Sequence, residues 1–174
     1  MPRGSYEASD KYLSMILKAE QKRYQIPRYQ RNYSWKRSQY ETLWNDVLDD
    51  RVKTSRGLFL GTILLNLPEK EGDRIEVIDG QQRLITLTIL LSSIRDTLDG
   101  LGDQGAAMKV HTSYIADSEY AGEEEIPILI TGRKLKKFFS NYIQQFPRTG
   151  DDFTLMTAQS EEEKNVEKCR KFFD

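Results

Sequence analysis

Apolar residues recur at helical spacing in five stretches of the chain. The predicted helices span residues 10–22, 37–53, 82–100, 132–146 and 160–174. Ser38 with Glu41, and Ser160 with Glu163, have the spacing of a capping box, so they mark the starts of the second and fifth helices. Gly100 marks the end of the third helix.

Shorter stretches of the chain favour extended structure. Residues 58–67 form a continuous apolar run that predicts a buried strand, and the alternating residues 74–78 predict its hairpin partner. Residues 23–27 are also expected to be extended, since a residue before proline prefers β geometry, and residues 126–130 have an extended pattern as well. Two breaks are expected, a flexible one at 99–106 and a solvated acidic loop at 118–125. The pattern as a whole predicts an α+β protein.

Composition narrows the function classes. The chain has 174 residues, of which 26 are basic and 27 acidic, giving a formal charge of −1. This balance argues against a DNA binder that relies on bulk charge, but not against a local basic patch. Cys169 is the single cysteine and His111 the single histidine, so disulfides within the chain and Cys/His zinc sites are excluded. We expect a cytoplasmic protein without a membrane span, because the N-terminus lacks a signal segment and the apolar run 84–91 is short.

The junction between the strand at 74–78 and the following helix has unusual chemistry, with the sequence DGQQR. A tight turn there leaves the first amides of the helix unpaired, and unpaired amides at a helix start favour an anion. Gly80 lacks a Cβ, so a ligand can approach the backbone. Arg83 lies in the first turn, where a cation costs about 0.3–1 kcal/mol unless an anion offsets it. The junction therefore predicts a phosphate site.

The neighbouring side chains suggest further roles. Gln81 and Gln82 are uncharged donors and acceptors that suit a ribose, a phosphate or an attacking water. Asp79 is a candidate Mg²⁺ ligand, or an acceptor for the turn amides. The alternative is an ordinary turn in which Arg83 pairs with a nearby carboxylate, and the spacing leaves both interpretations open.

A second candidate element is YQIPRYQRNYSW, residues 24–35, where cations alternate with aromatic residues. The alternation suits recognition of phosphates and bases, and we assign this role to Arg28 and Arg31. Tyr33 and Trp35 are expected to be largely buried instead. Gly61 lies inside the strand predicted at 58–67. A glycine there indicates the close approach of a ligand or of another chain segment, and packing against another segment is the commoner explanation.

Taken together, IPRYQRNYSW, FLGTILL and EVIDGQQRLITL resemble the N-terminal domain of GmrSD-type modification-dependent restriction endonucleases, whose three motifs occur in this order. The DGQQR loop is also similar, more remotely, to the phosphate-binding loops of ParB and sulfiredoxin. The resemblance implies a ParB/sulfiredoxin-like core, a small mixed sheet with flanking helices, followed by a helical extension. Residues 1–100 would be the nucleotide-binding core. Residues 101–174 would begin a longer helical region, because the last helix has an apolar face without a following partner.

The resemblance also implies a nucleoside triphosphate as ligand, with Mg²⁺. The residues that match its motifs are Asp79, Gly80, Gln81, Gln82 and Arg83 in the loop, and Arg28, Tyr29, Gln30 and Arg31 in the first motif. The family's histidine-rich nuclease module has no counterpart here, so we do not expect this chain alone to cleave DNA.

Three hypotheses follow for the function. The first is an NTP-binding and NTP-hydrolysing regulatory domain of an antiphage restriction system, with Asp79, Gln81, Gln82 and Arg83 as catalytic residues. The second is a DNA-binding module that senses a modified base, and the third a structural scaffold. The sequence leaves open which nucleotide is used, which DNA modification is sensed and whether the chain forms oligomers.

Overall fold

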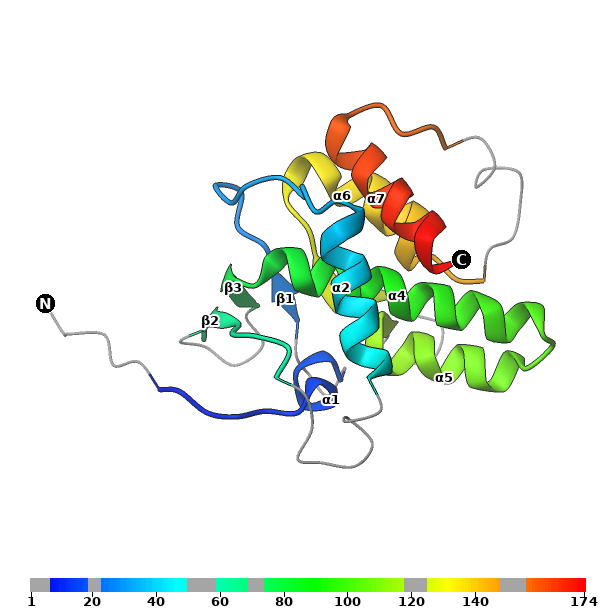
Figure 1. The fold of residues 1–174 in the computed structure, drawn as a ribbon, viewed down its shortest axis with the longest axis horizontal. Coiled ribbons are helices and arrows are strands. Elements are labelled where there is room, and N and C mark those ends of the chain that lie inside the picture. The colour runs from blue at the N-terminus through cyan, green and yellow to red at the C-terminus, as the bar shows by residue number, and fades with distance from the viewer. Residues whose placement is uncertain (1–6, 19–22, 50–58, 69–73, 118–124, 148–155) are drawn as a thin grey trace, which may run out of the picture.

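The computed structural model describes residues 7–18, 23–49, 59–68, 74–117, 125–147 and 156–174. Within them the chain is an α+β protein, as the sequence predicted, with a mixed four-stranded sheet and a separate two-stranded sheet (Figure 1). The strands are β1 (Tyr24–Gln25), β2 (Leu64–Asn66), β3 (Ile75–Asp79), β4 (Ala116–Asp117), β5 (Ile126–Pro127) and β6 (Leu129–Ile130). The helices are α1 (Leu13–Leu17), α2 (Arg37–Leu48), α4 (Gln81–Gly100), α5 (Gln104–Tyr114), α6 (Arg133–Phe139) and α7 (Glu161–Phe173), and a π-helical turn, Ser140–Gln144, extends α6.

The larger sheet has the strand order β2-β3-β1-β6. β1 runs parallel to both of its neighbours, with Tyr24 aligned to Ile75 of β3 and to Leu129 of β6. β2 pairs with β3 in the antiparallel direction, which confirms the predicted hairpin. Because β3, β1 and β6 are parallel, the segments that follow them all leave from the same edge of the sheet.

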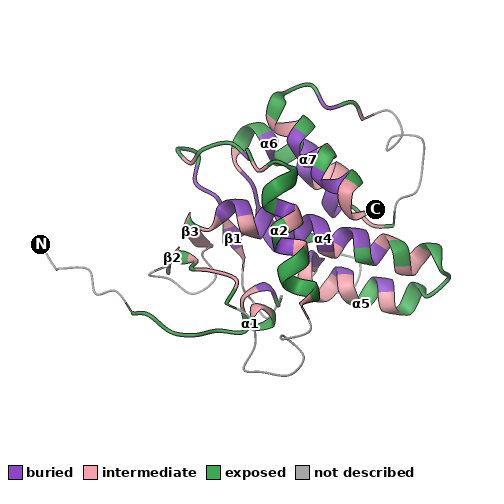
Figure 2. Ribbon diagram, viewed as in Figure 1, coloured by how far each residue is buried: buried purple, intermediate pink, exposed green. Residues whose placement is uncertain are grey.

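Helix α4 is the centre of the molecule. Most of its residues between Gln81 and Arg95 are buried (Figure 2), and it packs against α5, α7 and β6. One hydrophobic core joins α4 to the sheet and to α2, α6 and α7. The proposed division of the chain at residue 100 stays a prediction, although β6 and α7 lie on the far side of it and still contribute to this core.

The strand predicted at 58–67 is wrong in length and in burial. Only Leu64–Asn66 is β-structure, residues 59–63 are irregular, and residue 58 lies outside the described residues. Within the described residues β2 is at the edge of the sheet, where no other strand pairs with its outer side, and Leu64 and Asn66 are exposed. Gly61 is therefore in a loop that leads into an edge strand, and not inside a buried one.

A break is present inside the predicted range 99–106, but it is shorter than predicted. Only Leu101–Asp103 separates α4 from α5, and Gly102 makes the turn with φ of +87°. Asp103 caps α5 by accepting a hydrogen bond from the Ala106 amide at 3.0 Å. The glycines of this stretch suggested flexibility, but one of them lies inside a helix that the sequence analysis missed. The acidic segment 118–124 lies outside the described residues.

Three predicted helices are confirmed with changed boundaries. α1 is shorter than the predicted 10–22, because Lys18 is already extended, and residues 19–22 are not described. α2 begins after Lys36, whose amide donates to the side chain of Gln39 at 2.8 Å, so the predicted Ser38 cap is wrong. α2 ends at Leu48, and residues 50–53 of the prediction are not described. The helix predicted at 132–146 is α6 with its π turn.

The last helix follows its predicted capping box, with the Ser160 hydroxyl accepting from the Glu163 amide at 3.2 Å. The sequence left its apolar face without a following partner. In the structure, this face packs against earlier segments of the chain. Phe172 lies 5.0 Å from Tyr40 of α2 between ring centroids, and Val166 and Cys169 are buried in the shared core. Among the described residues, no helix is both long and apolar enough to cross a membrane.

Candidate functional site

The two predicted motifs lie next to each other because β1 and β3 are parallel neighbours. The loop after β1, residues 26–36, leads into α2, and the DGQQR loop follows β3 and opens α4 (Figure 1). Both leave the sheet at the carboxyl ends of its parallel strands. This is where open α/β sheets usually bind ligands.

Three glutamine side chains connect the two motifs. Gln81 donates its amide N–H to the Arg31 carbonyl at 3.0 Å. Gln82 uses both ends of its amide, accepting from the Ser34 amide at 2.8 Å and donating to the Asn32 carbonyl at 3.1 Å. In the other direction, Gln30 donates to the carbonyl of Ile78, at the end of β3, at 3.0 Å. Gln81 and Gln82 are buried, so much of their polar capacity holds the first motif in place.

The turn itself has the conformation that the sequence suggested. Gly80 has φ of +88°, the left-handed region that favours glycine, and a Cβ there would lie 3.0 Å from the side chain of Ile63. Its carbonyl accepts the first helical hydrogen bond, from the Leu84 amide. No hydrogen bond within the described residues uses the amides of residues 81–83, so this helix start keeps free donors.

Arg83 points to the loop before β2. Its guanidinium donates to the Thr62 carbonyl at 3.0 Å, and a Cβ on Gly61 would lie 2.4 Å from its Nη2 atom. Gly61 thus permits the close approach of this side chain, which explains a glycine with φ of +101° here. None of the ion pairs within the described residues involves Arg83.

A pocket of about 260 Å³ opens between the first motif, the start of α4 and the start of α6. Of the predicted site residues, Arg28, Gln30, Arg31 and Gln81 line it. The others lie outside its lining: Tyr29, Gly61, Asp79, Gly80, Gln82 and Arg83. The predicted site is therefore divided between this pocket and the turn on which Arg83 lies.

The pocket is lined mainly by basic residues among its charged groups, and two of its lining residues have a polar atom without a hydrogen-bond partner in the described part of the chain. The charged residues that line it are Arg28, Arg31, Arg133, Lys134 and Glu162, four cations and one carboxylate. Two buried side-chain atoms have no hydrogen-bond partner in the described part of the chain, Gln81 Oε1 and Thr131 Oγ1. Both residues line this pocket. Buried polar groups are rarely left unpaired, so the pocket has the properties of a site for a polar, negatively charged ligand.

Helix α7 also holds the first motif, through two side chains that the sequence patterns did not identify. Glu162 accepts a hydrogen bond from the Tyr33 amide at 2.7 Å, and Asn165 donates to the Tyr33 carbonyl at 3.3 Å. Burial raises the pKa of the Glu162 carboxyl, while the bond from Tyr33 opposes this shift. No local pattern marks these residues, since they lie more than 120 positions from their partners.

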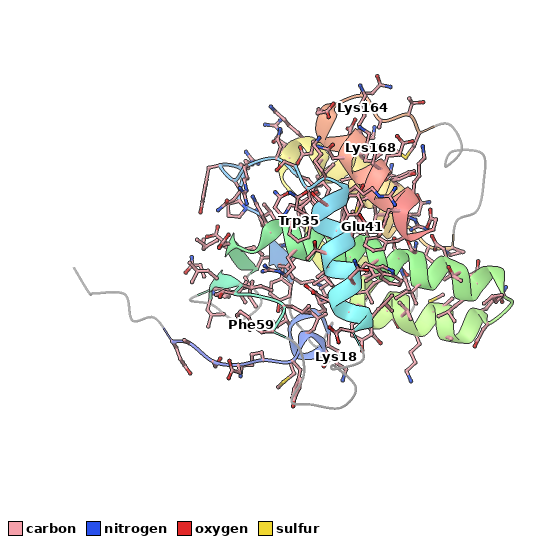
Figure 3. All side chains as sticks on the ribbon, in the orientation of Figure 1. Lys18, Trp35, Glu41, Phe59, Lys164 and Lys168 are labelled. Atoms are coloured by element: carbon pink, nitrogen blue, oxygen red, sulfur yellow. The ribbon has the colours of Figure 1, made fainter. Side chains whose placement is uncertain are left out.

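The aromatic residues of the first motif differ in exposure. Tyr33 is buried as predicted, with its hydroxyl 2.8 Å from that of Thr86. Trp35 is half-buried just before α2 (Figure 3). Tyr29 is 74% exposed beside the exposed Arg28, so its ring is available to a ligand.

The predicted metal site has limited support from side chains. The described residues contain no group of three or more His, Cys, Asp or Glu that could hold a metal. Asp79 is exposed at the end of β3. Mg²⁺ commonly uses one or two protein carboxylates together with phosphates and water, so a single carboxylate beside the turn is compatible with a metal brought by a nucleotide.

Comparison with protein families identifies a match over most of the chain. The family model described as GmrSD restriction endonuclease, N-terminal domain, matches residues 13–174. This range includes both motifs, the pocket and helix α7. No curated protein matches the chain.

Proposed function

The chain belongs to the family of GmrSD restriction endonuclease N-terminal domains, and from this premise we propose that it binds and hydrolyses a nucleoside triphosphate. In this proposal it is the regulatory domain of a modification-dependent, antiphage restriction system, on a ParB/sulfiredoxin-like core. Its nucleotide state controls DNA cleavage by a module elsewhere in the protein or on a partner.

One observation carries the proposal. The hydrogen bond from Gln81 to the Arg31 carbonyl joins the DGQQR loop to the first motif at a basic pocket. Arg28 and Arg31 line this pocket and have no ion pair within the described residues. Guanidinium groups bind phosphate oxygens in bidentate geometry, and phosphoryl transfer depends mainly on positioning and charge stabilisation. A nucleophilic side chain is therefore not required.

The two glutamines have different roles in this proposal. Gln82 has both amide atoms bonded to the first motif, so we assign it to the scaffold. Gln81 lines the pocket and retains a buried amide oxygen without a partner in the described residues, and this oxygen is suited to accept a hydrogen bond from the attacking water. Gly80 and the free amides that follow it bind phosphate oxygens from the turn.

Arg83 and Asp79 belong to the side of the site nearer β2. Arg83 has donors besides the one bonded to Thr62, and these are assigned to the outer part of the phosphate chain. Asp79 is the residue that would hold Mg²⁺, which would supply charge neutralisation at the phosphates when bound. Gly61 keeps the Arg83 side chain in place.

Calorimetric titration with ATP and with GTP in Mg²⁺ buffer tests the proposal, together with phosphate release. Wild-type protein is expected to bind at least one of them saturably and to release phosphate. Arg31→Ala is expected to reduce affinity about tenfold or more, since one charge-assisted contact is lost. Lys168→Ala is the matched control, because Lys168 is an exposed cation on α7 that does not line the pocket (Figure 3). Absence of binding to both nucleotides contradicts the proposal.

A second candidate function is DNA binding, with Tyr29 stacking on a modified base. The observation that favours it is the exposure of this ring beside two cations. A duplex carrying the modified base, titrated at 50 and 200 mM salt, separates the two functions. Strong, steeply salt-dependent duplex binding without any nucleotide response favours DNA recognition.

A further inference from the structure

The pocket has a third wall that neither motif includes. It is the segment Thr131–Lys134, which follows β6 and begins α6. β6 is parallel to β1, with Gln25 aligned to Ile130, so Thr131 leaves the sheet at the same edge as Ile26. The segments after β3, β1 and β6 thus meet at one edge. Sequence patterns identified the first two as ligand-binding elements and passed over the third.

Two residues that line the pocket have a buried polar atom without a partner in the described residues, and they lie on two of these segments. Gln81 is in the segment after β3 and Thr131 in the segment after β6, and each is 4% exposed. The threonine hydroxyl can donate a hydrogen bond to an anionic oxygen, whereas the glutamine oxygen can only accept one. The pair therefore suits a phosphate group with a water molecule beside it.

The charges of the third wall complete the anion site. Arg133 and Lys134 line the pocket together with Arg28 and Arg31, and neither forms an ion pair within the described residues. Glu162, the pocket's carboxylate, is held by the Tyr33 amide. The pocket's volume of about 260 Å³ is below the usual range for whole drug-sized ligands, roughly 300–1,000 Å³. It matches the phosphate chain of a nucleotide better than the complete molecule.

We propose that Thr131, Arg133 and Lys134 form a phosphate-binding wall that holds the polyphosphate chain of the nucleotide against Arg28, Arg31 and Gln81. The inference rests on the proposed nucleotide function and assigns to this pocket the part of the phosphate chain that lies beyond the turn and Arg83. Thr131 and the two cations bind phosphate oxygens, and Gln81 faces the water. The base extends toward the exposed Tyr29.

Calorimetric titration of the 174-residue chain with inorganic tripolyphosphate, ATP and GTP at 150 mM salt tests the wall. The double variant Arg133→Ala/Lys134→Ala is expected to lose about tenfold or more in affinity for tripolyphosphate and for the bound nucleotide. Thr131→Val is expected to lose affinity by a smaller factor, since it removes one hydroxyl donor. The control is Lys136→Ala/Lys137→Ala, which removes two exposed cations from the same helix outside the pocket. Its affinities are expected to stay within about twofold.

The outcomes separate the wall from the proposed function. If Arg133→Ala/Lys134→Ala binds nucleotide like wild type while Arg31→Ala does not, the wall is wrong and the nucleotide function stands. If Arg133→Ala/Lys134→Ala and Lys136→Ala/Lys137→Ala lose affinity equally, the effect comes from overall charge, and the phosphate-binding wall is wrong. If wild type binds none of the three probes, both proposals fail. If Arg133→Ala/Lys134→Ala loses affinity for duplex DNA but keeps its affinity for tripolyphosphate and nucleotide, the proposed ligand class is wrong. Circular dichroism of each variant confirms folding.

Discussion

The amide oxygen of Gln82 accepts a hydrogen bond from the backbone amide of Ser34 at 2.8 Å, across 48 positions of sequence. The same side chain donates to the Asn32 carbonyl. Gln82 is 3% exposed, so the bonds lie in a region with little competition from water. A residue of the signature loop is thus part of the framework that shapes the first motif.

Gln82→Ala is expected to destabilise the protein by about 1–3 kcal/mol, because it removes two partly buried hydrogen bonds to the backbone of the first motif. Urea unfolding followed by circular dichroism measures this change. Gln104→Ala, at an exposed position of α5, should change stability by less than about 0.5 kcal/mol. Similar unfolding midpoints for the two variants would contradict the framework role.

Gly61→Ala is expected to cost more than about 1 kcal/mol, because its φ of +101° disfavours alanine and the new Cβ meets the Arg83 guanidinium. The double variant Gly61→Ala/Arg83→Ala should recover part of the cost, with a coupling of roughly 0.5–3 kcal/mol. Gly105→Ala is the control, since its Cβ would have ordinary contacts inside α5 and should be neutral or stabilising by up to about 1 kcal/mol. Strict additivity would mean that Gly61 does not position Arg83.

His111 should titrate below its ordinary pKa of 6.5. Burial lowers its pKa, and the bond from Nε2 to Glu125 at 2.9 Å opposes the shift. Arg95 can only donate, so Nδ1, 3.2 Å from Arg95 Nη1, accepts and the neutral ring carries its proton on Nε2. Because this is the single histidine of the chain, its ring C–H signals in an NMR titration give the pKa directly. A midpoint at or above 6.5 would contradict the prediction.

The same shift has a consequence for stability. A lowered pKa in the folded state means that the unfolded chain binds the proton more readily. The contribution of His111 is therefore fully present above pH 6.5 and is lost as the pH falls below 6.5 through the folded pKa. Urea unfolding at several pH values should show a shallower fall over this interval in His111→Gln than in wild type.

Cys169 should be unreactive while the protein is folded. Burial raises the pKa of its thiol to about 12, and only the thiolate is a good nucleophile. Ellman's reagent at pH 8 should modify it very slowly in buffer and within minutes in 8 M urea. Rapid modification of the native protein would show that α7 separates readily from α2 and α4.

Sequence patterns were reliable where a local rule decides the structure. The Ser160/Glu163 capping box, the hairpin of β2 and β3, and the long buried helix after DGQQR follow from spacing and from turn chemistry alone. The same is true of Gly80, where a strand meets a helix and only a residue without a Cβ adopts the turn easily. These features depend on neighbours a few positions apart.

Other features depended on contacts that no local pattern contains. The apolar run before β2 suggested burial, but its place at the sheet edge leaves residues such as Phe59 exposed. The Gly-rich stretch at 99–106 suggested a break, but most of it is helical because Asp103 caps α5. The roles of Gln82, Glu162 and Thr131 come from partners 48 to 129 positions away, or from the strand order.

The amino-acid sequence by itself determined the α+β composition of this domain, its family and the two motifs at the edge of its sheet, because residue spacing and turn chemistry are local properties. Tertiary structure decided which of those residues share a pocket and which only support it. It also decided that a third segment, after β6, faces the same space. The reason is that parallel pairing brings together chain segments whose separation in sequence carries no signal of their proximity.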